Sequence, residues 1–258
     1  MSLLSVEDLT VHFHSRNGII KAVRNLSFIL DYGETLAIVG ESGSGKSVAS
    51  YSLLDLIPKP PGKIEAGKAI FNGSDLLALE TLDLQKIRGN EIAIIFQDPM
   101  SSLNPYLTIG EQLVEPIIYH KKKSRGEAKE LALSMLTEVG LNSLDNKFDC
   151  FPHELSGGMQ QRAMIAMALI TKPKLLICDE PTTALDVTTQ AQIIRLIHKI
   201  QEKYKIAVIF ISHDLGVVAG IADKIIVMKD GEAIETGITN DIFYNPKTKY
   251  TKKLLSSI

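Results

Sequence analysis

The sequence predicts an α/β fold in which helices cover a parallel core sheet. The apolar run Thr35–Val39 is typical of a strand buried on both faces. A glycine-rich loop follows it at once, and then a helical stretch over Ser47–Ile57, which we expect Pro58 to end. Along the rest of the chain the order is helical block, strand, helix and strand. This order is typical of parallel strands joined by crossover helices.

The N-terminal third predicts strands joined by tight turns, and we expect it to form an antiparallel β region. Leu4–Phe13 and Ala22–Leu30 are its first two strands, and the pair Asn72-Gly73 marks a hairpin turn. Later strands are expected at Glu91–Phe96, Leu175–Cys178 and Ala207–Ser212, with a hairpin over Ile225–Ile234 that turns at Asp230-Gly231.

A helical block separates the first core strands from the later ones. Apolar residues recur at helical spacing in Ile109–Tyr119 and Ala128–Val139. A further amphipathic helix is expected between the strands at 175–178 and 207–212, with Ile193, Ile194, Leu196, Ile197 and Ile200 on its buried side. We therefore predict a single domain over residues 1–258, with an inserted helical subdomain over 98–165.

Composition limits the classes of function. A formal net charge of −2 creates no bulk attraction to nucleic acid or anionic lipid, so we expect no nucleic-acid partner. No apolar stretch reaches the ~20 residues of a membrane span, and Met1–Thr10 does not resemble a secretory signal. Two cysteines, Cys150 and Cys178, are too few for a metal cage or a disulfide framework. We expect a reducing, cytosolic location, with any membrane role coming through partner subunits.

The loop Gly40–Ser47 matches the phosphate-binding pattern G-x-x-x-x-G-K-[S/T]. Its glycines let successive backbone N–H groups point at phosphate oxygens, and the helix that begins near Lys46 adds its positive dipole end. Lys46 supplies a mobile cation for the β- and γ-phosphates, and the Ser47 hydroxyl is expected to be a ligand for Mg²⁺. A chance glycine-serine loop is the alternative, and the strand before and helix after argue against it.

Two acidic residues end the later strand at 175–178. Asp179 emerges at its carboxyl end, where ligands bind in open α/β sheets, and is expected to hold Mg²⁺. Glu180 is then available as a general base for the attacking water. Cys178 is interpreted as core filler.

The segment Leu155–Arg162 reads Leu-Ser-Gly-Gly-Met-Gln-Gln-Arg, and here the sequence resembles the ABC ATPase family, whose signature is L-S-G-G-x-Q. The resemblance implies a P-loop NTPase core of RecA-like fold. Ser156, Gly157 and Gly158 offer a hydroxyl and open N–H groups at a helix N-terminus, a second anion site. In the family this site caps the γ-phosphate bound by a partner subunit, so that two subunits close head-to-tail over two ATP molecules.

The resemblance covers essentially the whole chain and assigns further roles. Phe13 matches the aromatic residue that stacks on adenine, although a core phenylalanine remains the alternative. Gln97 matches the glutamine that senses Mg²⁺ and the attacking water, and Ala184-Leu185-Asp186 matches the loop that contacts the partner subunit. His213 matches the histidine at the γ-phosphate.

The expected cofactors are ATP and Mg²⁺. The expected catalytic residues are Lys46, Gln97, Glu180 and His213, and the expected Mg²⁺ ligands are Ser47, Gln97 and Asp179. The expected nucleotide contacts are Phe13, Gly40, Glu41, Ser42, Gly43, Ser44, Gly45, Lys46, Ser47, Val48, Ser156, Gly157, Gly158, Gln160 and Asp186.

A narrower resemblance concerns three further segments, Gln97–Pro105, Pro152–Glu154 and Asn245–Thr251, which look like those of oligopeptide, dipeptide and nickel importer ATPases. It implies a second ATPase subunit, identical or different, two transmembrane permeases and, indirectly, an extracytoplasmic binding protein. The chain would then lie on the cytoplasmic face of the membrane. Members of the peptide branch often continue into a C-terminal extension, sometimes with several cysteines, whereas this sequence ends at Ile258 with no cysteine after Cys178. A short, nickel-like branch and a longer parent chain both stay open.

Two other functions remain as alternatives. An exporter ATPase would lack the pattern over Asp98–Pro105. A non-transport ABC protein of DNA repair or translation usually carries long coiled-coil insertions or two tandem cassettes, and this sequence has neither.

Overall fold

A computed structural model describes residues 2–16, 18–141, 147–183 and 185–256 of the chain. The chain divides into two compact units, which are described separately: residues 1–85 with 207–258, and residues 86–206. No helix in the described ranges is long and apolar enough to cross a membrane.

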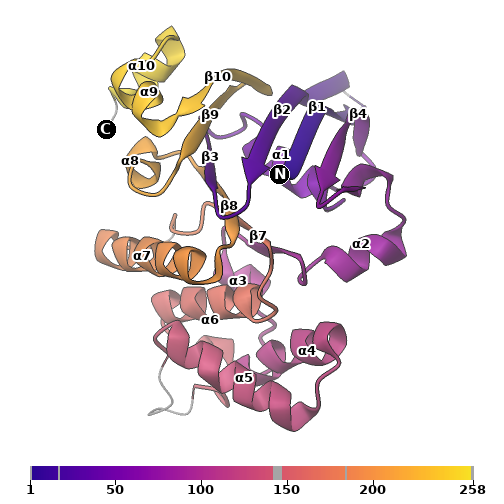
Figure 1. The fold of residues 1–258 in the computed structure, drawn as a ribbon, viewed down its shortest axis with the longest axis vertical. Helices are drawn as coiled ribbons and strands as arrows, with labels where there is room; N and C mark the ends of the chain where they lie inside the picture. Colours follow the sequence, from indigo (N-terminus) through magenta and orange to yellow (C-terminus); the bar gives the residue numbers. More distant parts are fainter. Residues whose placement is uncertain (1, 17, 142–146, 184, 257–258) are drawn as a thin grey trace. The chain divides into compact units, whose positions relative to one another are not determined.

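The first unit contains a four-stranded antiparallel sheet in the order β2-β1-β4-β5 (Figure 1). Its strands are β1 (Ser2–Ser15), β2 (Gly18–Asp31), β4 (Gly62–Phe71) and β5 (Ser74–Asp75). Asn72 and Gly73, both with positive φ, form the turn between β4 and β5, as the sequence predicted. The expected antiparallel β region is therefore present.

The first unit also holds parallel strands. The fully buried strand β3 (Thr35–Val39) lies between β8 (Ala207–Ser212) and β9 (Lys224–Lys229) and is parallel to both. The strand β10 (Glu232–Ile238) pairs with β9 in the predicted hairpin, whose turn is Asp230 and Gly231. Neighbouring strands pair with both edges of β3, and all of its residues are buried, so its two faces are covered as well. Burial on both faces explains its run of apolar residues.

The helices of the first unit are short. After β3 comes α1 (Lys46–Leu53), and after β5 come the 3₁₀ turn η1 (Leu76–Ala78) and α2 (Thr81–Ile87), which runs into the second unit. The C-terminal part adds α8 (Leu215–Val218), α9 (Thr239–Tyr244) and α10 (Lys249–Leu255). The prediction that Pro58 ends the first helix was wrong. The helix ends at Leu53, and Asp55 already has a φ of +54°, a left-handed conformation that a continuing helix does not allow.

The second unit is mostly helical. Its described residues include the strands β6 (Ile92–Ile95) and β7 (Leu175–Asp179), which pair in parallel. The helices within its described residues are α3 (Pro99–Ser102), α4 (Ile109–Lys121), α5 (Arg125–Glu138), the 3₁₀ turn η3 (Pro152–Glu154), α6 (Gly157–Leu169) and α7 (Val187–Tyr204). Figure 1 shows α4 and α5 side by side, and both begin with a capping box, from Thr108 and Ser124.

The described part of 98–165 contains helices and turns but no strand, in keeping with the helical content predicted for it. That this range forms a separate subdomain stays a prediction. On α7, Ile193, Leu196, Ile197 and Ile200 are buried as expected, whereas Ile194 is only half-buried. Cys178 is fully buried in β7, and this burial raises the pKa of its thiol far above the ordinary value. A thiol with a raised pKa is a poor nucleophile, which agrees with a packing role.

Candidate active site

The loop Gly40–Ser47 leaves the buried end of β3 and enters α1 at Lys46. Gly40 and Gly45 have φ values of +153° and +100°. A Cβ atom on Gly40 would lie 2.2 Å from the carbonyl oxygen of Met228, and one on Gly45 would lie 2.2 Å from that of Ala22. Glycine is required at both positions because backbone atoms close the space that a side chain would need.

Lys46 and Ser44 are the two buried polar side chains of this loop. The Lys46 ammonium donates hydrogen bonds to the carbonyl oxygens of Gly40 (2.8 Å) and Glu41 (2.9 Å), and only 5% of the residue is exposed. The Ser44 hydroxyl is buried and has no hydrogen-bond partner among the described residues. A buried ammonium group lies in the same glycine loop as a buried hydroxyl that has no described partner. Both groups can donate hydrogen bonds to an anionic phosphate.

Two contacts from distant parts of the first unit hold the loop. The backbone N–H of Gly231 donates to the carbonyl oxygen of Ser44 (3.1 Å), and the N–H of Glu41 donates to the Tyr250 hydroxyl (3.2 Å). Burial raises the pKa of Tyr250, so its phenol stays neutral. Tyr250 entered the sequence prediction only as part of a C-terminal pattern, and its contact with the loop was not predicted. Nothing in the sequence indicates a hydrogen bond between residues more than 200 positions apart.

His213 follows β8 at the same sheet edge as the phosphate loop. Val39 pairs with Ser212 in the parallel register of β3 and β8, so Gly40 and His213 leave adjacent strand ends. His213 is exposed.

Phe13 lies on β1 of the four-stranded sheet, where it is half-buried. A Cβ on the neighbouring Gly62 would lie 3.1 Å from the Phe13 ring. The other predicted nucleotide-binding residues of the first unit lie in the loop 40–47 and at the start of α1. Of these, Glu41, Ser42 and Gly43 are exposed, and Ser47 and Val48 are half-buried.

In the second unit, the ends of β6 and β7 bring Gln97 and Glu180 together. Ile95 pairs with Cys178, so the residues that follow both strands leave the same edge. Asp179 is the last residue of β7 and is 3% exposed, while Glu180 is half-buried. Glu180 has a φ of +45°, an uncommon conformation for a residue with a side chain and one that is concentrated at functional sites.

One oxygen of the Glu180 carboxylate accepts hydrogen bonds from Thr183 and Gln97. The Thr183 hydroxyl donates to Oε2 over 3.0 Å, and the Gln97 side-chain amide donates to the same atom over 3.4 Å. Gln97 and Glu180 were predicted from the sequence as site residues, whereas Thr183 was not. A hydroxyl residue three positions after a carboxylate, in a turn, was the available signal.

The segment Ser156–Gly158 begins α6. The Ser156 hydroxyl accepts a hydrogen bond from the N–H of Met159 (3.4 Å), and Ser156 and Gly157 are exposed. Gln160 is buried, and its amide donates to the carbonyl oxygens of Pro152 (2.8 Å) and Leu155 (3.3 Å). These bonds hold the chain that enters the helix, so in this structure Gln160 supports the segment from within.

Asp186 caps α7, and Thr189 in the first turn of that helix lies near the start of α6. Its carboxylate accepts hydrogen bonds from the N–H (3.0 Å) and the hydroxyl (2.7 Å) of Thr189, and these bonds hold its pKa below the ordinary value. A Cβ on Gly158 would lie 3.0 Å from the Thr189 methyl group. Thr189, which the sequence analysis missed, therefore joins Asp186 to the signature segment. Ala184 lies outside the described residues.

Comparison with known proteins identifies the family. The family model described as "ABC transporter" matches residues 23–183. The chain is 52% identical over 256 residues to the oligopeptide transport ATP-binding protein OppD of Bacillus subtilis, covering 99% of this chain and 72% of that protein. It is 51% identical to the dipeptide transport ATP-binding protein DppD of the same organism (99% and 76%) and 49% identical to OppD of Escherichia coli (100% and 76%).

Solved structures agree with these matches. The ATP-binding cassette MJ0796, as a dimer in a post-hydrolysis state bound to ADP and Pi, has a TM-score of 0.80 at 31% identity, covering 92% of this chain and 98% of that one. The protein cbiO1 from Clostridium perfringens has a TM-score of 0.79 at 26% identity (95% and 91%). The α/β fold predicted from the sequence is thereby confirmed as that of a nucleotide-binding cassette. The chain belongs to the ABC transporter family, as one of its ATP-hydrolysing cassettes.

Proposed function

We propose that this chain hydrolyses ATP to energise the uptake of oligopeptides or dipeptides by an ABC importer. The observation that carries the proposal is its identity of about one half, over almost its whole length, to proteins named for oligopeptide and dipeptide transport. The pattern over Gln97–Pro105 supports an importer and argues against an exporter. Nickel, which the sequence resemblance also allowed, has no support from these relatives, so peptides are the proposed substrates.

The phosphate groups of ATP would be held by the loop 40–47 and the first turn of α1, with Val48 included. The buried Ser44 hydroxyl and the Lys46 ammonium support this assignment. Lys46 would exchange its bonds to the carbonyl oxygens of Gly40 and Glu41 for bonds to phosphate oxygens. Phe13 would stack on the adenine ring.

Ser47, Gln97 and Asp179 would hold Mg²⁺. Their hydroxyl, amide and carboxylate oxygens form the all-oxygen donor set that this hard cation prefers. When bound, Mg²⁺ supplies positive charge that offsets the negative charge of the phosphates. Asp179 is 3% exposed at the end of a buried strand, so its carboxylate is held by the fold rather than by solvent.

Glu180 would accept the proton of the attacking water. Thr183 and Gln97 both donate to Oε2, and these bonds orient the carboxylate. His213 would donate a hydrogen bond to the γ-phosphate. Electrostatic positioning of this kind supplies most of the catalysis in phosphoryl transfer.

Ser156, Gly157 and Gly158 would bind the γ-phosphate held by a second ATPase subunit, with Asp186 at the same interface. The exposed hydroxyl and N–H groups at the start of α6 support this role. Two such subunits would close only when ATP is present, because the added anion contacts exist only in the closed state. The second subunit is identical or different in this proposal, and two permeases would receive the movement at the cytoplasmic face of the membrane, with an extracytoplasmic binding protein delivering the peptide.

Uptake measurements in the source cells test the substrate. Deleting the gene should abolish uptake of a labelled peptide and leave uptake of ⁶³Ni²⁺ unchanged. Complementation with the wild type should restore peptide uptake, and complementation with Lys46→Ala should not. Loss of nickel uptake alone would reject the peptide proposal while leaving the ATPase assignment intact.

A further inference from the structure

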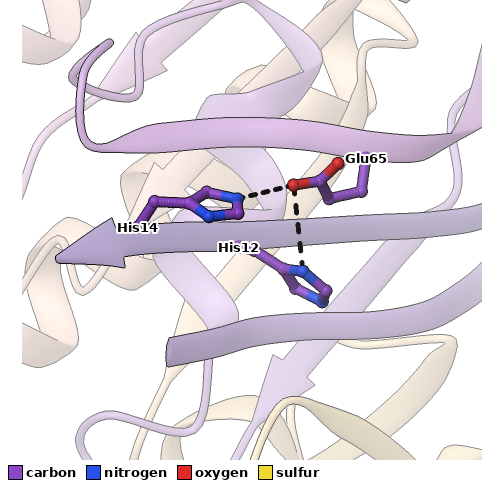
Figure 2. A group of neighbouring side chains, drawn as sticks. All are labelled: His12, His14 and Glu65. Atoms are coloured by element: carbon purple, nitrogen blue, oxygen red, sulfur yellow. Dashed lines mark hydrogen bonds and ion pairs between the residues drawn. The ribbon is translucent and has the colours of Figure 1, made fainter. Parts of the chain in front are cut away.

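Two histidines and a glutamate lie together on the four-stranded sheet of the first unit. His12 and His14 are two residues apart on β1, so their side chains leave the same face of the strand. On the neighbouring strand β4, Ala66 pairs with Thr10 and Ile64 with Val11, so Glu65 between them has no partner in the register. A bulge of this kind redirects a side chain, and Figure 2 shows Glu65 pointing at the two imidazoles.

One carboxylate oxygen of Glu65 faces both rings. The distance from Oε1 to His14 Nε2 is 2.6 Å, and the distance to His12 Nδ1 is 3.9 Å (Figure 2). One potential ligand atom from each of the three residues lies within 4.8 Å of the others. The exposed fractions of the side chains are 19% for His12, 44% for His14 and 23% for Glu65, so the group is open to an entering ion.

The other carboxylate oxygen, Oε2, is held by Lys63 over 2.7 Å. Lys63 therefore orients the carboxylate without occupying the atom that faces the histidines. Partners of this kind, which fix and polarise a ligand, commonly accompany metal ligands.

We propose that His12, His14 and Glu65 bind one divalent transition-metal ion of the borderline class, for which Zn²⁺ is the probe. Two imidazole nitrogens and one carboxylate oxygen suit Zn²⁺, whereas Mg²⁺ and Ca²⁺ require oxygen ligands. With metal–ligand bonds of about 2.0–2.2 Å, the three atoms must come to roughly 3–3.5 Å from one another. Exposed side chains reach this by shifts on the order of 1 Å. A fourth position is left for water or another ligand.

Isothermal titration of the metal-free full chain with ZnCl₂, without nucleotide, tests the site. The wild type should bind one Zn²⁺ more tightly than His12→Ala, His14→Ala or Glu65→Gln, each of which should lose at least about 10-fold in affinity, since even partners outside the metal's own ligands are worth that much. Co²⁺ should show visible absorption bands in the wild type that these variants lack. Millimolar Mg²⁺ should not displace the zinc.

His198→Ala is the matched control. The His198 ring lies 3.6 Å from Glu202 on α7, so it offers a histidine–carboxylate pair without the third group. This variant should bind Zn²⁺ as the wild type does. Circular dichroism and thermal unfolding without metal should match the wild type for all variants. If an alanine variant fails to fold, Glu65→Gln, which keeps the shape of the side chain, tests the metal site on its own.

Equal zinc affinity and stoichiometry in the wild type and the three ligand variants would overturn the proposal, and so would an equal loss in His198→Ala. Displacement by Mg²⁺ would assign the ion to an oxygen site instead. None of these measurements uses ATP, so their outcome is independent of the proposed transport function.

Discussion

The Thr183 hydroxyl donates a hydrogen bond to Oε2 of Glu180 over 3.0 Å, and this contact defines how the proposed general base is held. A base must be ionised and aimed before it can take a proton from water. Thr183, three residues after Glu180, partly sets the direction of the Glu180 carboxylate. Both residues lie in one turn, and Glu180, its first residue, has a positive φ. The backbone conformation of this turn therefore helps to orient the proposed base.

Glu180→Gln should bind ATP as the wild type does and lose about 10²–10⁴-fold in the rate of hydrolysis, because the amide cannot accept a proton at neutral pH. Single-turnover hydrolysis and nucleotide binding are the two measurements. A rate near that of the wild type in the assembled transporter would remove Glu180 from the role of base.

Thr183→Val removes the Thr183 hydroxyl, one of the donors to Glu180, and keeps the shape of the side chain. A hydrogen bond to a charged group contributes about 1.5–3 kcal/mol, so we expect kcat to fall by roughly tenfold or more while KM for ATP changes little. Thr183→Ser should restore the rate. A change in KM with kcat preserved would mean that Thr183 acts in binding rather than in positioning.

Ser156→Asp should abolish cooperative hydrolysis and leave the chain's own ATP affinity nearly unchanged. Aspartate keeps the cap of α6 but brings a negative charge to the proposed phosphate contact. Ser156→Arg should act in the same direction through its size. Ser124→Asp makes the same change at the cap of α5 and serves as the control. Equal loss of ATP binding in Ser156→Asp would show that the segment does not act on the nucleotide of a partner subunit.

Gly45→Ala and Gly43→Ala separate backbone strain from steric collision. Both glycines have positive φ, so alanine costs about 1–3 kcal/mol at either position. A Cβ on Gly43 meets nothing within 4 Å, whereas one on Gly45 would lie 2.2 Å from the Ala22 carbonyl oxygen. Urea unfolding should therefore show the greater loss for Gly45→Ala. Equal losses would mean that the backbone around Ala22 moves to make room.

Glu235 should make stability depend on pH. Burial by itself raises the pKa of this carboxyl, but the N–H of Lys247, the hydroxyl of Thr251 and the N–H of Thr248 outweigh it, and the pKa lies below its ordinary value. A lowered pKa means that the carboxylate stabilises the fold above about pH 4.3, its unfolded value, and that this stability is lost as pH falls.

Glu235→Gln should thus reduce the free energy of unfolding by about 1.5–3 kcal/mol at pH 7, and by less below about pH 4. The exposed Glu232, which pairs with Arg24, provides the control, because Glu232→Gln should change stability by no more than about 0.5 kcal/mol. A pH-independent difference for Glu235→Gln would contradict the assignment.

Patterns confined to neighbouring residues could be predicted from the sequence. Hydrophobic periodicity and turn pairs placed β8 at its observed bounds and the turns at Asn72-Gly73 and Asp230-Gly231. The end of α1 was misjudged because proline is a strong breaker, while the left-handed Asp55 that follows the observed end leaves no comparable mark in sequence.

The sequence by itself determined the phosphate loop, the acidic pair Asp179-Glu180 and the signature segment, because each depends on residue types at a fixed local spacing. Only the tertiary structure decided that Tyr250 and Gly231 hold the loop, that Thr189 joins Asp186 to Gly158, and that Glu65 turns toward His12 and His14. These contacts depend on strand register, on a bulge and on the packing of segments that are far apart in the sequence. Such features arise from packing of the whole chain, and no local pattern encodes them.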